Sequence, residues 1–178
     1  MRAVVMPGNE KELSDMAKNL GYSSLLLLYE KKESFCNAKL SLPYENSLLL
    51  SKTAQKEYSF NVVLKGADRP SIERSKFLGV VDSEIFSESY RKSGLEQVKC
   101  ALLGKKGISV LFSFSTLLHA QDRGLIMGKM SQNIRLCRKY RVPMRIALMA
   151  KSPLELRAPK DVQSLFILLG MHPKEAVL

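Results

Sequence analysis

The chain has 178 residues, 46% of them hydrophobic and 25% charged, a composition that excludes a disordered protein and predicts one folded domain over residues 1–178. Apolar runs such as Leu25–Tyr29 are too short to span a membrane, and Met1–Pro7 lacks the apolar core and cleavage site of a secretory signal. We therefore expect a cytoplasmic protein. The cysteines (Cys36, Cys100 and Cys137) are far apart, so neither a disulfide framework nor a CxxC metal site is indicated.

The net charge of +11 is divided unevenly along the chain. Residues 1–90 hold 12 Lys+Arg and 12 Asp+Glu, whereas residues 91–178 hold 16 and 5. An ordinary solvated surface explains most single lysines. It does not explain why one half is neutral and the other strongly cationic, which is the pattern expected of a surface that binds a polyanion.

The first thirty residues predict a βαβ unit. Residues 2–6 form a short β-type run, and Asn9 is placed to cap a helix with Glu12 in the capping-box position. That helix carries one apolar stripe, made of Leu13, Met16, Ala17 and Leu20, and Gly21 ends it. The uninterrupted apolar run at Ser24–Tyr29 is typical of a strand buried on both faces of a parallel sheet. The fold class is therefore α/β.

The middle of the chain continues the alternation of strand and helix. Residues 30–58 give a weaker pattern, with a third strand centred on Leu48–Leu50. We expect a fourth strand at Phe60–Leu64, a loop at Lys65–Pro70, a short helix at Ser71–Lys76 and a fifth strand at Gly79–Val81. This spacing is that of a β/α barrel.

The second half contains the clearest elements. We expect a helix at Gly94–Leu103 with an exit turn at residues 104–107, a strand at Ile108–Phe114 followed by Ser115 or Thr116 as a helix cap, and a long helix at about Asp122–Tyr140. Spacing on the long helix places Met127, Met130, Ile134 and Cys137 on one face. The same spacing puts Lys129, Arg135 and Lys139 on the opposite side, where ordinary solubility and RNA contact are about equally good interpretations.

The last forty residues form a well-delimited unit. A strand is expected at Arg145–Met149, a loop at residues 150–157, and a helix at about Pro159–Leu169 with Pro159 in its first position and Gly170 just past its end. The loop and the helix start carry Lys151, Arg157 and Lys160. Loops that follow strands are where α/β proteins place their sites.

Catalytic motifs are not indicated by this sequence. His119 and His172 each stand alone, so no His-x-His metal cluster or Ser-His-Asp arrangement can be named. Gly124–Met130 superficially resembles a phosphate-binding loop, but its glycine spacing is one residue short and it falls inside a helix. A strongly basic half without catalytic groups favours a binding protein over an enzyme.

The C-terminal third resembles a known family. Ile134–Pro143 reads as a helix ending in a Tyr-x-Val-Pro turn, Ala150–Pro153 as a loop that contains Ser-Pro, and Glu155–Asp161 as a Leu-Arg-x-Pro-x-Asp helix start. In this order they resemble protein component 3 of archaeal and eukaryal ribonuclease P, the thirty-kilodalton-class subunit family. The resemblance covers residues 107–178, and before that it is topological only, with residues 30–58 abbreviated.

The resemblance implies a TIM-barrel-like (β/α) barrel, incomplete or distorted, and a non-catalytic role in supporting the RNA that removes the 5′ leader of precursor tRNA. It also implies that Mg²⁺ ions sit on the catalytic RNA and that the protein holds no cofactor. The implied partners are ribonuclease P RNA, precursor tRNA indirectly, and the small ferredoxin-like protein component 2 in a heterotetramer; no membrane partner is expected.

Seven basic residues are the candidate RNA contacts: Arg69, Arg123, Lys129, Arg135, Lys151, Arg157 and Lys160. For Arg157, a salt bridge to Asp161 that holds the loop is nearly as good an interpretation as RNA contact. The alternative function is a phosphate-handling β/α-barrel enzyme, a phosphoesterase-like protein whose basic loops hold substrate phosphate.

Overall fold

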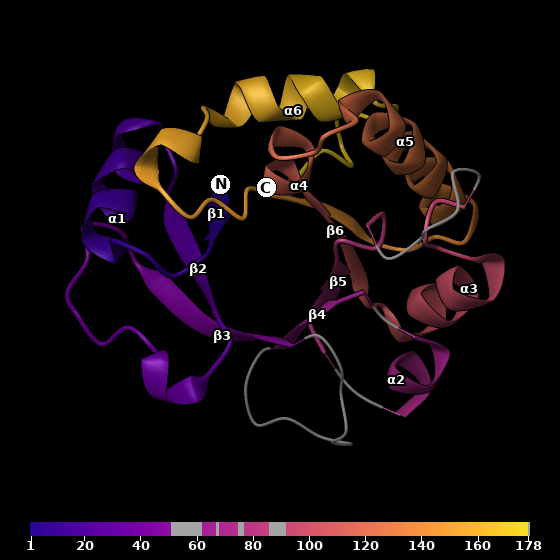
Figure 1. The fold of residues 1–178 in the computed structure, drawn as a ribbon, viewed down its shortest axis with the longest axis horizontal. Coiled ribbons are helices and arrows are strands. Elements are labelled where there is room, and N and C mark those ends of the chain that lie inside the picture. Colours follow the sequence, from indigo (N-terminus) through magenta and orange to yellow (C-terminus); the bar gives the residue numbers. More distant parts are fainter. Residues whose placement is uncertain (51–61, 67, 75–76, 86–91, 178) are drawn as a thin grey trace.

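The protein folds as a ring of parallel strands. The computed structural model describes residues 1–50, 62–66, 68–74, 77–85 and 92–177. Seven strands form one parallel sheet in sequence order: Arg2–Val5 (β1), Ser24–Tyr29 (β2), Tyr44–Leu50 (β3), Val62–Lys65 (β4), Gly79–Val81 (β5), Ser109–Ser113 (β6) and Met144–Ala147 (β7). Figure 1 looks down the ring with the carboxyl ends of the strands toward the viewer. The architecture is a TIM-barrel-like α/β fold that is nearly closed, as predicted.

The ring closes at a seam between β7 and β1. The segment just after β7 makes one isolated parallel bridge, Val5 to Ala150. Here the Met6 N–H donates to the Ala150 carbonyl at 2.9 Å, and the Met149 N–H donates to the Val4 carbonyl at 2.7 Å. Within β7, the Ile146 N–H donates to the carbonyl of Val177 at 2.8 Å. The last described residue of the chain therefore occupies part of the place that an eighth strand fills in a complete barrel.

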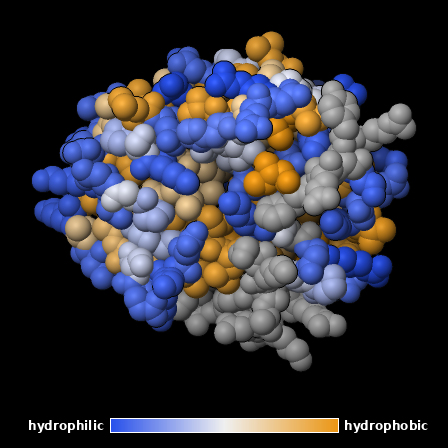
Figure 2. Space-filling view, viewed as in Figure 1, coloured by the Kyte–Doolittle hydropathy of each residue, from blue (hydrophilic) through white to orange (hydrophobic). Residues whose placement is uncertain are grey.

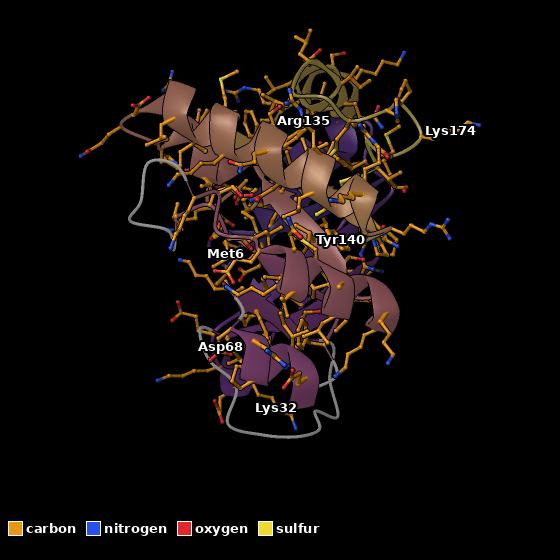
Figure 3. The ribbon with its side chains drawn as sticks, turned by 90° about the vertical axis from the view of Figure 1, so that its right-hand side faces the viewer. Met6, Lys32, Asp68, Arg135, Tyr140 and Lys174 are labelled. Atoms are coloured by element: carbon orange, nitrogen blue, oxygen red, sulfur yellow. The ribbon has the colours of Figure 1, made fainter. Side chains whose placement is uncertain are left out.

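Helices cover the outside of the ring. They are Glu10–Asn19 (α1), Arg69–Arg74 (α2), Gln97–Lys106 (α3), Arg123–Lys139 (α5) and Pro159–Leu168 (α6), whereas the short helix Phe114–Leu118 (α4) lies at the mouth of the ring, after β6. The fully described connection between β2 and β3 holds only the 3-10 turn Lys32–Ser34 (η1), so the barrel is distorted as expected. Figure 1 shows α6 side-on between α1 and α5, and Figure 3 shows it end-on, so α6 crosses the seam instead of running beside the strands.

Two apolar layers hold the fold together. The interior of the ring is filled by alternate strand residues, which are Val4, Leu26, Leu28, Leu49, Val63, Val81, Leu111 and Ala147, together with Met149. The other strand faces pack on the helices, for example where Phe112 of β6 meets Phe166 of α6 with ring centroids 6.3 Å apart. In the described ranges no helix has the length and apolar character that crossing a membrane requires.

Most predicted elements are confirmed within two or three residues, and the N-cap at Asn9 is confirmed by its side chain, which accepts from the Glu12 N–H at 3.4 Å. β3 begins at Tyr44, earlier than its Leu core suggested. For β4, the predicted residues 60 and 61 lie outside the described ranges. In α2, Arg69 is already helical instead of lying in a loop, and the predicted residues 75 and 76 also lie outside the described ranges.

Two predictions in the second half were wrong in detail. The helix predicted at Gly94–Leu103 is shifted to Gln97–Lys106, because residues 104–106 continue the helix and only Gly107, with φ of 66°, ends it. The residue that caps α4 is Ser113, the last residue of β6, not Ser115 or Thr116. Its hydroxyl accepts from the Thr116 N–H at 3.1 Å.

Candidate nucleic-acid interface and the barrel mouth

Exposed cations of the second half mostly lack acidic partners. Five of the seven candidate residues are exposed and take part in none of the ion pairs found among the described residues: Arg123, Arg135, Lys151, Arg157 and Lys160. An exposed guanidinium or ammonium with no carboxylate beside it is free to neutralise a phosphate. These five side chains are the predicted contacts that keep an exposed charge, and the fold distributes them over three places.

The first place is the mouth of the barrel, at the carboxyl ends of the strands. Lys151 lies directly after the seam, against Gly8 of the β1–α1 connection, where a Cβ on that glycine would meet the Lys151 carbonyl at 2.6 Å. Its N–H donates to Glu155 at 2.9 Å, which fixes the loop backbone but leaves the ammonium exposed. Arg123 begins α5 and donates to the Leu118 carbonyl at 3.2 Å, so it is anchored beside the same mouth.

The second place is the start of α6 on the outside of the ring. Arg157 donates to the carbonyls of Leu154 and Leu156, both at 2.7 Å, and its own carbonyl accepts from the Tyr22 hydroxyl at 2.9 Å. The loop is thus held by carbonyls, and the salt bridge to Asp161 weighed in the sequence is not among the ion pairs of the described chain. Lys160 is exposed in the first turn of the helix.

The third place is the outer side of α5. Arg135 is exposed there, and Figure 3 shows it on the side of α5 toward α6. The predicted apolar face of α5 is confirmed for Met130, Ile134 and Cys137, which are fully buried, whereas Met127 is only partly buried. Figure 1 shows that α5 adjoins the end of α6 and that the start of α6 lies near α1, so Arg135 and the cations at the start of α6 stand at opposite ends of that helix.

Two candidates do not have the free cation that the sequence suggested. Lys129 is 6% exposed, so its predicted place on the outer face of α5 was wrong. Its Nζ donates to the backbone carbonyl of Glu84 at 3.3 Å. Arg69 is exposed but bound to Glu73 one helical turn away, with Nε to Oε1 at 2.7 Å. The helical spacing predicted for the apolar residues of α5 was correct. The buried side of this helix is wider than that apolar stripe, because it also includes polar residues.

The candidates left out four exposed cations at the opposite, amino-terminal end of the barrel: Lys105, Arg141, Arg145 and Lys174. Lys139, which the sequence placed on the outer side of the long helix, is exposed at the same end. Lys105 and Lys139 lie in the last turns of α3 and α5, Arg141 follows α5, Arg145 lies in β7 and Lys174 follows α6. Figure 3 shows Tyr140 and Lys174 at this end, away from Met6. In the sequence, the four residues left out were visible only as part of the net positive charge of the second half. A cation at a helix C-terminus is also stabilised by the helix dipole, so these residues have a structural explanation of their own.

A cavity of about 810 Å³ opens at the barrel mouth. Its walls are mainly apolar and include Met6, Leu49, Ile85, Leu125 and Met149, and polar side chains enter from β6, α4 and the loop before α5. Figure 2, which looks onto this end, shows hydrophobic side chains in the middle of the face and hydrophilic ones around them. The volume lies within the range of roughly 300–1,000 Å³ typical of sites for small organic ligands.

Two of the three carboxylates that line the cavity have partners, and the third, Glu30, is exposed. Asp82, only 6% exposed, accepts from the Thr116 hydroxyl and lies 3.9 Å from the Lys65 ammonium. Asp122 is used as the N-cap of α5, where its carboxylate accepts from the Leu125 N–H at 2.9 Å. Asp82 also has a positive φ of 58°, a conformation that costs free energy in a residue with a side chain. A strained backbone conformation of this kind persists only where neighbouring contacts, here those of the Asp82 carboxylate, fix the residue.

Behind the mouth, a buried polar cluster binds the segment after β5 to α5. The Asn133 amide donates to Glu84 Oε1 at 2.8 Å and to the Ser93 carbonyl at 2.9 Å, so one side chain holds two points nine residues apart. Burial raises the pKa of the Glu84 carboxyl to about 7; the nearby charge of Asp82 also raises it, while the Asn133 hydrogen bond and the Lys129 charge oppose the rise. Among the described residues, no group of three or more His, Cys, Asp or Glu is placed to hold a metal ion.

The fold and the surface define a class: a nearly closed parallel β/α barrel whose second half presents unpaired cations. Comparison with known proteins gives the family. The family described as RNase P subunit p30 matches residues 83–177, more than half of the chain, and the chain belongs to this family. The resemblance proposed from the Tyr-x-Val-Pro and Leu-Arg-x-Pro-x-Asp patterns is thereby confirmed.

Individual relatives agree with that assignment. Ribonuclease P protein component 3 of Thermococcus kodakarensis is 28% identical over 94% of this chain and 70% of its own length. The protein of the same name from Thermococcus gammatolerans is 39% identical, but over 47% of this chain and 40% of its own length. A chain in the cryo-EM structure of archaeal ribonuclease P with mature tRNA matches the fold with a TM-score of 0.79 at 14% identity, covering 98% of this chain and 86% of that one.

Proposed function

We propose that this protein is a non-catalytic, RNA-binding subunit of ribonuclease P that supports the catalytic RNA in removing the 5′ leader of precursor tRNA. The observation that carries the proposal is the group of exposed cations without acidic partners in the half of the chain that matches the family. The contacts we assign to RNA are Arg123, Arg135, Lys151, Arg157 and Lys160. Lys129 and Arg69 are left out because the first is buried and the second is paired with Glu73.

The physical basis of the role is electrostatic. Each cation that neutralises a phosphate releases a condensed counterion, so affinity falls with salt in proportion to the number of such contacts. Arg157 is preorganised for this task because its loop is already fixed by carbonyls and by the Tyr22 hydroxyl, and little further ordering is needed on binding. Arginine can also grip a phosphate through two N–H groups, which lysine cannot.

The proposal includes the partners of the complex. The catalytic RNA is the direct partner and precursor tRNA an indirect one, and the Mg²⁺ ions that cleave the substrate are held by the RNA, with no cofactor on the protein. The small ferredoxin-like protein component 2 is the proposed protein partner, in a heterotetramer. The family assignment and the fold shared with a chain of an archaeal ribonuclease P complex support this proposal.

The test is the salt dependence of binding to ribonuclease P RNA for matched pairs of variants. R123A/K151A removes two cations at the mouth and R157A/K160A removes two at the start of α6. K11A/K18A removes two exposed lysines from α1 in the neutral half. Each of the first two pairs is expected to lower the slope of log K against log salt by about 2, at roughly 0.9 per contact, and the α1 pair to leave it unchanged.

Two results would contradict the proposal. Equal losses for all three pairs mean that binding follows net charge and not this surface. If instead K105A/R141A, at the amino-terminal end, is the only double variant that lowers the slope, the assigned residues are wrong. The role itself is tested by reconstitution: the protein is expected to raise precursor-tRNA cleavage only with the RNA and partner subunits present. Metal-dependent phosphodiesterase activity of the protein alone would support the enzyme alternative.

A further inference from the structure

The barrel mouth combines a largely apolar interior with a charged rim, where the cations Lys151 and Arg123 stand on one side and the exposed carboxylate of Glu30 also belongs to the lining. The interior carboxylate of Asp82 is already engaged by Thr116 and Lys65, and that of Asp122 caps α5. An anionic group placed beside these carboxylates would therefore meet no unpaired cation, whereas an uncharged group needs no cation as a partner. The rim is different, because the ammonium of Lys151 is exposed and takes no acidic partner among the described residues.

Hydrogen-bonding groups line one side of the same cavity. Ser115, Thr116, His119 and Gln121 all contribute to its wall, from α4 and from the turn that leads into α5. The His119 side chain lies next to the Glu155 carboxylate, with 3.5 Å between Nε2 and Oε1. Donors and acceptors along one wall, together with apolar side chains such as Leu49 and Met149 elsewhere in the lining, suit a flat ligand that is polar at its edge and apolar on its face.

We infer that the cavity takes the base of a single unstacked nucleotide, with the attached phosphate at the rim against Lys151 and Arg123. A nucleobase is uncharged, has polar edges and apolar faces, and fits easily in about 810 Å³. Arg123 directly follows the lining residue Asp122 and is tethered to the Leu118 carbonyl, so its guanidinium stands at the same edge. The inference rests on the proposed function where the nucleotide belongs to the catalytic RNA, and the same chemistry applies to a free nucleotide.

The first experiment detects occupancy directly. Methionine methyl groups labelled with ¹³C are observed by NMR while adenosine, guanosine, cytidine or uridine 5′-monophosphate is added, with ribose 5-phosphate as the control that lacks a base. Met6 and Met149 line the cavity, and Met130, Met144 and Met171 do not. We expect the first two signals to move with the nucleotides and not with ribose 5-phosphate, while the other three stay in place.

The second experiment asks whether the nucleotide belongs to RNA. Ala120→Trp fills the cavity from its wall, and Gln132→Trp adds the same side chain on the exposed face of α5 as a control. Insertion of an uncharged base predicts that A120W weakens binding of the catalytic RNA on the order of tenfold at every salt concentration, without changing the salt slope. R123A/K151A is expected to change the slope instead. Ala120→Leu is the smaller filling substitution to use if A120W lowers the melting temperature.

The outcomes separate the possibilities. Weaker RNA binding by A120W but not Q132W supports an RNA nucleotide in the cavity. Unchanged RNA binding, together with nucleotide shifts at Met6 and Met149 that A120W abolishes, supports a free nucleotide. RNA binding that A120W leaves intact, with no nucleotide effect on the two methyls, overturns the inference while leaving the proposed function standing. Failure of the unaltered protein to bind the RNA at all would remove the proposed function, and the NMR experiment would then decide the inference alone.

Discussion

The buried carboxyl of Glu84 makes a quantitative prediction about stability and pH. Its side chain is 1% exposed and its pKa is raised from 4.5 to about 7, mainly by burial. The folded state therefore binds this proton more tightly than the unfolded state does. The associated stability is fully present below about pH 4.5 and is lost as pH rises through about 7. At about 1.4 kcal/mol for each tenfold change in the acid constant, the loss amounts to roughly 3 kcal/mol.

The substitution Glu84→Gln tests this value. Glutamine keeps the shape of the side chain and the Oε1 acceptor for the Asn133 amide, but it cannot ionise. At pH 5 the variant and the unaltered protein both carry a neutral group at this position, so their free energies of unfolding should differ little. At pH 8.5 the variant should be more stable by about 3 kcal/mol, because only the unaltered protein then has to bury a charge.

The assay is urea unfolding of both proteins from pH 5 to 8.5, with Glu33→Gln, an exposed glutamate of η1, as the control. The informative quantity is the change with pH of the difference between variant and unaltered protein, because effects of the substitution that do not depend on pH cancel. A difference that stays constant over this range, or that changes equally for Glu33→Gln, would refute the reasoning that burial holds the Glu84 proton.

Three further predictions follow from single contacts. Gly104→Ala should destabilise the fold by roughly 2 kcal/mol in urea unfolding, because a Cβ there would lie 2.3 Å from the Tyr140 carbonyl; an unchanged midpoint would contradict this close approach. Asn9→Ala should cost about 1 kcal/mol in the same assay through loss of the α1 cap, and Asn9→Asp should restore most of it. Arg138 holds the pKa of Glu175 below its usual range, so Arg138→Ala should destabilise the protein at pH 7 and progressively less as pH falls through the pKa of Glu175. Thermal unfolding at pH 7, 5 and 3.5 measures this effect. A loss of stability that does not depend on pH would contradict the ion pair.

Much of the barrel could be predicted from local patterns. Ser24–Tyr29 and Gly79–Val81 were predicted at their observed bounds, because an apolar run between turn residues is a local property and turns in α/β units are short. The start of β3 was missed because Tyr44–Asn46 are not a buried apolar run; they pair with β2 through backbone register, while Glu45 carries an ion pair to Arg2. Pairing between strands is not visible from one strand alone.

For the candidate site, the sequence predicted that basic residues of the second half are involved, but not which of them are exposed and unpaired. Lys129 looked like an outer cation because the spacing of Met130 and Ile134 defines an apolar stripe, but the buried side of α5 also includes Asn133. What keeps that polar side buried is Glu84, 49 residues earlier in the chain. Which of the other cations are unpaired depends on whether a carboxylate lies nearby in space, as Glu73 does for Arg69. The cavity was not predicted because its walls come from many strands and loops that are far apart in the sequence.

The seam between β1 and β7 bears on the order in which the ring can be completed. During synthesis the first six strands can pair with their neighbours as they appear, because each partner immediately precedes it in sequence. Closure has to wait for residues 149 and 150, and the apolar outer face of the seam is covered only when α6 has formed. A nascent chain stopped at Ala158 would therefore contain the residues that close the ring but not the helix that covers the seam. In chain order, the hydrogen bonds that close the ring therefore precede the helix that shields them from water.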